Sequence, residues 1–113
     1  MRFNIQGLPQ FIQLFFKDSV IPKRLTITFQ GGFVGTRCAV TMPDREILTM
    51  IYPEDVNRQQ VFDLPQSHPN IVDGISALKL VFEESSDFFG RITVYDLKVE
   101  GMKGSQIECN NRR

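Results

Sequence analysis

The stretch LTITFQGGF, residues 25–33, alternates apolar and threonine side chains and then breaks at two glycines. A period of two residues is typical of a β-strand with one buried face. Glycine allows positive φ angles and close backbone approach, so the break predicts a loop after the strand. The apolar face consists of Leu25, Ile27 and Phe29.

The same period of two recurs along the chain on both sides of this stretch. Pro22 separates the first two apolar runs, and proline does not belong inside a central strand. The best helix candidate is 70–77, with Asn70 or Asp73 as cap, but Gly74 weakens it. We therefore expect an all-β sandwich or jelly roll. The expected strands are 11–16, 25–29, 46–52, 60–64, 78–82 and 91–99.

The length and charge of the chain indicate how many domains it has and which partners it is suited to bind. The 113 residues fit one domain, which we place at 1–104, followed by a polar tail at 105–113. The 13 basic and 13 acidic residues cancel, whereas nucleic-acid binding needs a concentrated positive surface. No stretch reaches the roughly 18 apolar residues of a membrane span. We expect neither a nucleic-acid nor a membrane partner.

The two cysteines and the single histidine give no catalytic or metal-binding pattern. Cys38 and Cys109 are expected to be free thiols, which favours an intracellular location in the nucleus or cytoplasm. His68 has no activated nucleophile near it in sequence and is interpreted as an exposed loop residue. No CxxC, HExxH or EF-hand pattern is present. We predict no enzyme activity, no cofactor and no metal.

Two loops are the candidate partner or ligand sites. Phe88 and Phe89 are adjacent, so in a strand one would enter the core and the other would remain on the rim as a contact residue. Arg91 either lines a ligand pocket or, as we prefer, forms an ion pair with Asp87. The candidate residues are Gly31, Gly32, Phe33, Asp87, Phe88, Phe89 and Arg91.

Three separated segments, LTITFQGGF at 25–33, IYPED at 51–55 and LKLVFEESSDFFGRITVYDLKVEG at 78–101, resemble a family of small nuclear-receptor-associated proteins. The resemblance runs from about Phe3 to Lys103. That family is known as a repressor partner of an orphan testicular nuclear receptor. It is similar to the discoidin domain, whose fold is a galactose-binding-like jelly roll.

The resemblance implies a binding module without a catalytic site. Discoidin-like domains bind glycans, lipids or proteins through loops at one end of the sandwich, and the intracellular character favours a protein partner. We expect a transcriptional co-regulator of the repressor type, monomeric or weakly oligomeric, with a protein partner such as a nuclear receptor. A carbohydrate- or small-ligand-binding module is the alternative. The chain has no LxxLL motif, so the receptor contact is expected to use loops or the sheet.

One departure from the family concerns the first residues. The resemblance implies that family members carry a first strand and a loop before the position of Met1. A shortened gene model, a fragment or a true variant would each account for this. The expected sandwich then lacks its first strand and has an unpaired edge, which is a liability for solubility.

Overall fold

The structure is a computed structural model that describes residues 3–5, 7–66 and 68–103. Seven antiparallel strands and one 3-10 turn account for its regular structure, so the expected all-β class is confirmed for this part of the chain. The strands are β1 (Phe3–Ile5), β2 (Gln10–Phe29), β3 (Gly35–Thr41), β4 (Ile47–Ile51), β5 (Gln59–Asp63), β6 (Ile75–Ser85) and β7 (Ile92–Lys103), and the 3-10 turn η1 is Pro69–Ile71.

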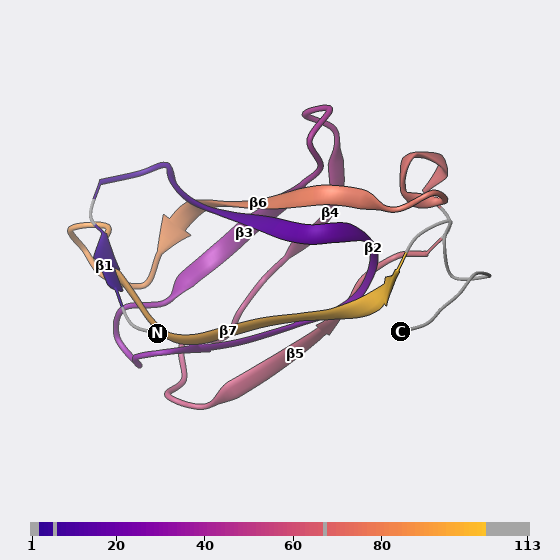
Figure 1. Cartoon of the computed structure of the whole chain (residues 1–113). Helices are drawn as coiled ribbons and strands as arrows, with labels where there is room; N and C mark the ends of the chain where they lie inside the picture. The colour runs from indigo at the N-terminus through magenta and orange to yellow at the C-terminus, as the bar shows by residue number, and fades with distance from the viewer. Residues whose placement is uncertain (1–2, 6, 67, 104–113) are drawn as a thin grey trace.

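The long strand β2 belongs to both layers of the molecule (Figure 1). Its first half pairs with β6, and the upper layer continues through β3 to β4. Its second half pairs with β7 and β5 in the lower layer, and β1 pairs with β7. The register of β2 against β6 shifts between Phe15 and Val20, where the strand bends from one layer into the other. The two layers are thus two parts of one continuous sheet.

The core lies between the layers. Leu25, Ile27 and Phe29 are buried along the second half of β2, as the alternation predicts. In the core, the Phe29 ring meets the Phe82 ring of β6 edge to face, with 5.9 Å between centroids. Each fully buried aromatic side chain contributes several kcal/mol of hydrophobic stabilisation, of the order of 2–3. The core therefore fixes the relative position of the layers through strands distant in sequence.

Pro22 does not separate two strands, so that prediction is wrong. It lies inside β2 opposite Gly101, and the register shifts between Pro22 and Arg24. Proline is tolerated at such a bulge because the regular hydrogen-bond ladder is already interrupted there. A Cβ on Gly101 would collide with the carbonyl oxygen of Ile21, so the glycine lets the two backbones approach closely.

One strand is missing from those expected from the sequence. It is β3, which begins at Gly35, and Cys38 and Val40 are buried in it. The weak helix candidate 70–77 forms only the short turn η1, and β6 has begun by Ile75, in agreement with the all-β expectation. The described residues contain no helix long and apolar enough to cross a membrane.

Candidate functional site

The loops that precede β3 and β7 lie together at one end of the sandwich (Figure 1). The amide of Gln30 donates to the carbonyl of Thr93, and the amide of Thr93 donates to the carbonyl of Phe33, both at 2.9 Å. The amide of Ser86 donates to the carbonyl of Val34 at 2.9 Å. The two sequence-predicted loops therefore form one surface, which we call the loop end.

The carboxylate of Asp87 organises the turn between β6 and β7. Its Oδ2 accepts hydrogen bonds from the amides of Phe89 at 3.1 Å and Arg91 at 3.0 Å. The Arg91 side chain donates through Nε to Oδ2 at 2.8 Å and through Nη2 to Oδ1 at 3.0 Å. This paired, charge-assisted geometry is the strong form of an arginine–carboxylate contact. The preferred interpretation of Arg91 as an ion-pair partner of Asp87 agrees with this geometry.

The ion pair of Asp87 with Arg91, which we call the clamp, sets the electrostatics of the turn. The Arg91 side chain lowers the pKa of Asp87 from its ordinary 3.8 to about 2, chiefly through their hydrogen bond. The same contact raises the pKa of Arg91. Only 10% of the Asp87 side chain is exposed, so the carboxylate lies under the turn whose amides it accepts hydrogen bonds from. Both groups are charged at neutral pH, and the turn is neutral as a unit.

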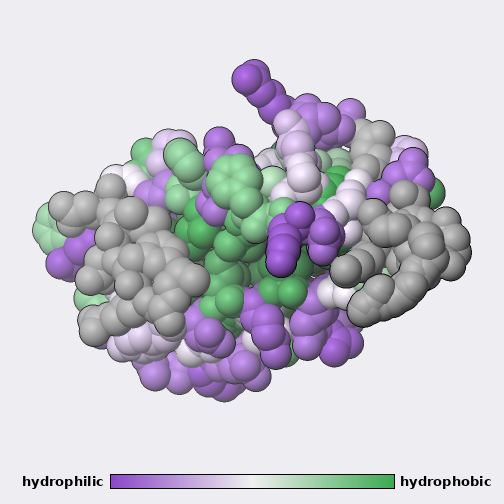
Figure 2. Space-filling model, viewed as in Figure 1, coloured by the Kyte–Doolittle hydropathy of each residue, from purple (hydrophilic) through white to green (hydrophobic). Residues whose placement is uncertain are grey.

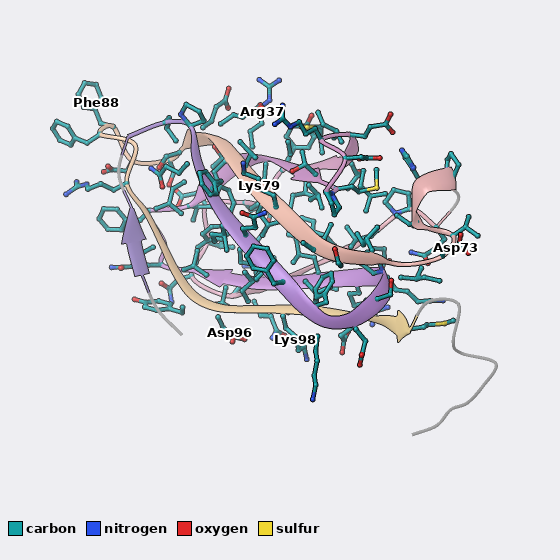
Figure 3. All side chains as sticks on the ribbon, turned by 45° about the horizontal axis from the view of Figure 1, so that its top comes forward. Arg37, Asp73, Lys79, Phe88, Asp96 and Lys98 are labelled. Carbon is teal, nitrogen blue, oxygen red and sulfur yellow. The ribbon has the colours of Figure 1, made fainter. Side chains whose placement is uncertain are left out.

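Phe88 and Phe89 form an aromatic tip on this turn. Their side chains are 93% and 68% exposed, and the rings meet edge to face with centroids 5.1 Å apart. The prediction that one of them enters the core is wrong, because the pair sits in a turn closed by Gly90 at φ 77° and not in a strand. In Figure 3, Phe88 projects at the opposite end of the molecule from Asp73.

Arg91 and Leu8 extend the surface around this tip. The Arg91 guanidinium carbon lies 5.2 Å from the centroid of Phe33 and 5.4 Å from that of Phe89, which is within cation–π range. Leu8 is 42% exposed and approaches Gly90. The loop end thus combines exposed apolar side chains with one charge pair that is already internally satisfied.

The glycine loop is held by two residues that the sequence reasoning did not select. The Gly31 amide donates to Oδ1 of Asn57 at 2.9 Å, and the Gly32 amide donates to Oδ1 of Asp55 at 2.8 Å. These amides are satisfied by the protein and do not form an open phosphate cradle. Asp and Asn two residues apart are common in turns, so the sequence carried no signal for this role.

The remaining candidate groups lie away from the loop end. His68 is half-buried, with Nε2 3.3 Å from Oε1 of Glu46, which differs from the exposed loop histidine that was expected. Cys38 is a fully buried free thiol, and this burial raises the pKa of Cys38 to about 12. Cys109 lies outside the described residues. Among the residues that are described, no group of three or more His, Cys, Asp or Glu could hold a metal ion.

Comparison with the sequences of known proteins assigns the chain to a family. The chain is 38% identical over 102 residues to the nuclear receptor 2C2-associated protein of Mus musculus, covering 87% of this chain and 69% of the relative. It belongs to the family of nuclear receptor 2C2-associated proteins. Its family relatives include the Danio rerio protein, 40% identical over 103 residues, and the Homo sapiens protein, 37% identical over 102, with the same coverage. No family model matches the chain.

Proposed function

We propose that this chain is a non-enzymatic, intracellular protein-interaction module that binds a nuclear receptor and acts as a transcriptional co-regulator of the repressor type. The relatives carry a name that states association with nuclear receptor 2C2. The proposed location is the nucleus or the cytoplasm. A protein partner agrees with a site that offers exposed aromatic side chains and no metal cluster among the described residues.

The aromatic tip carries this proposal. Buried aromatic anchors account for much of the affinity in protein interfaces, and rigid anchors lose little conformational entropy on binding. Phe88 and Phe89 are the most exposed large hydrophobic side chains of the loop end, yet the backbone beneath them is fixed by the Asp87 hydrogen bonds. A receptor pocket would therefore receive two rings that are already in place.

A binding titration against the ligand-binding domain of nuclear receptor 2C2 tests the proposal. We expect the intact chain to bind, and the double variant Phe88→Ser, Phe89→Ser to weaken the complex by about 2 kcal/mol or more, the loss usual for interface hot spots. Val72→Ser is the matched control, because Val72 is 62% exposed and lies beside η1 at the other end. No binding by the folded chain, or equal losses in both variants, would refute the proposal.

A carbohydrate-binding module is the second candidate. The observation in its favour is that Phe33, Phe89 and Arg91 meet at one end, as a stacking site for a sugar requires. Against it, both Asp87 oxygens engage the Arg91 guanidinium. A glycan array distinguishes the two functions, since hits that disappear in Phe89→Ser would favour the sugar.

We further infer that the sandwich is a discoidin-type jelly roll. In its support, two antiparallel layers are joined by a shared strand, and the loops of one end form the exposed apolar surface. An experimental structure compared strand by strand with discoidin domains would test this inference.

A further inference from the structure

The first half of β2 has an open edge. Residues 10–15 pair with β6 on one side, and no strand of the described chain pairs with their other side. Figure 1 shows this half of β2 at the near edge of the upper layer, and Figure 2 shows hydrophobic residues gathered in the middle of the same face. An open edge presents backbone N–H and C=O groups that can pair with another strand.

Residues 10–16 of this edge carry no internal charge or proline that would discourage pairing. They read QFIQLFF and lie between Pro9 and Lys17. Phe11 and Phe15 are 56% and 76% exposed on the outer face, whereas Ile12 and Leu14 are half-buried on the inner face. The other outer edge of this layer, β4, offers only five residues for pairing, Ile47–Ile51.

The edge also reads nearly the same in both directions. In antiparallel pairing about Gln13, Phe11 of one copy would lie opposite Phe15 of the other, and Ile12 opposite Leu14. Opposed residues share a face in an antiparallel pair, and these partners match in both chemistry and face. Gln13 would meet its own symmetry mate with no repulsion between like charges. Such self-complementarity is the requirement for a two-fold interface.

We propose that β2 is a homodimerisation edge, at which a second copy of this chain adds its own residues 11–15 in antiparallel register centred on Gln13. The two upper layers then form one continuous sheet. Phe11 and Phe15 of the two copies pack together on its outer face, where the Lys79 ammonium lies 4.2 Å from the Phe11 ring centroid (Figure 3). One strand pair is a small interface, so the dimer is weak and depends on concentration.

Dimerisation through β2 does not depend on receptor binding at the loop end, because the two surfaces use different residues. The variant Phe88→Ser, Phe89→Ser should therefore dimerise like the intact chain, so failure of receptor binding and failure of dimerisation are separate results.

Sedimentation equilibrium over a concentration series gives the first test. We expect a monomer–dimer equilibrium, and Gln13→Glu should raise the dissociation constant at least about tenfold, or ~1.4 kcal/mol, because it places two carboxylates opposite each other. Within one chain the new carboxylate lies opposite Lys79 of β6, so the strand itself keeps its place. Gln59→Glu makes the same change at an exposed position of β5 and should leave the constant unaltered. A chain that stays monomeric throughout, or a dimer insensitive to Gln13→Glu, would overturn the proposal.

Disulfide trapping in a Cys109→Ser background then tests the register. Opposed residues of an antiparallel pair have Cα atoms about 4.5–5.5 Å apart, within the range of a disulfide. Gln13→Cys should cross-link with itself under mild oxidation, whereas Phe11→Cys and Phe15→Cys should cross-link efficiently only when mixed. Thr49→Cys tests whether the dimer forms through β4 instead. Trapping at Thr49 but not at Gln13 would show that the dimer forms elsewhere and would overturn the assignment.

Discussion

Two pairs of exposed phenylalanines are held in place by different means. Phe88 and Phe89 stand on a turn whose backbone is bonded to the side chain of Asp87. Phe11 and Phe15 stand on a strand whose position depends on its ladder with β6 and on the core below. The first pair depends on a local charge and the second on distant packing. A change that disturbs one pair should therefore leave the other in place.

The largest expected effect comes from removing the core support. Phe82 is fully buried, packs edge to face on Phe29 and lies opposite Gln10 at the start of β2. We expect Phe82→Ala to lower the free energy of unfolding by about 3–5 kcal/mol, through lost burial and a cavity. Urea denaturation measures this loss, and Phe82→Leu should recover part of it. A loss below about 1 kcal/mol would contradict the dependence of β2 on this core.

A smaller loss in the free energy of unfolding is expected at Gly35, whose backbone packs against the Phe82 ring. A Cβ on Gly35 would collide with the Phe82 ring, so Gly35→Ala should cost about 1–3 kcal/mol through overpacking. The double variant Gly35→Ala, Phe82→Leu should cost less than the sum of the single changes, because the smaller side chain makes room. Denaturant unfolding of all three variants gives the comparison. Additive losses would show that the two residues do not compete for space.

The turn that carries Phe88 and Phe89 should respond to pH, whereas Phe11 and Phe15 on β2 should not. The pKa of Asp87 is lowered from 3.8 to about 2, so the clamp is fully formed above the ordinary value and is lost as the pH falls through the folded value. We expect the amides of Phe89 and Arg91 to lose hydrogen-exchange protection between these limits. An NMR titration follows both. Asp87→Asn should weaken the turn at neutral pH and abolish this response, and titration of Asp87 near 3.8 would contradict the clamp.

The smallest effect on stability is expected at the tip itself. Phe88 is 93% exposed, so Phe88→Ala should change the free energy of unfolding by no more than about 0.5 kcal/mol. Thermal unfolding of this variant beside the intact chain provides the measurement. A larger loss would mean that the tip supports the fold in addition to any binding role.

The sequence predicted the fold where side chains alternate regularly. Leu25, Ile27 and Phe29 in β2 and Leu78, Leu80 and Phe82 in β6 are buried as expected. The strand at 35–41 was missed because Cys38, Ala39 and Val40 are all buried, which removes the alternation. Pro22 was misread because proline normally ends a strand, and only the three-dimensional pairing with Gly101 reveals the bulge that accommodates it.

The candidate site was predicted in part. The ion pair of Asp87 with Arg91 could be inferred because the two residues are four apart on either side of a turn. The exposure of both aromatic rings could not, because it depends on where the strand ends and the turn begins. Asp55 and Asn57 reach the glycine loop from a distant connection, and nothing in their own sequence marks that contact.

The sharing of β2 between the layers has a consequence for synthesis on the ribosome. Its described partner strands, β5, β6 and β7, all follow it in the chain. At a translation rate of about 5–20 residues per second, its uncharged residues 10–16 wait several seconds for Ile75–Ser85 to emerge. During that interval, the segment is of the exposed apolar kind that chaperones shield. Slower translation should therefore increase dependence on chaperones, whereas changes confined to the aromatic tip should not.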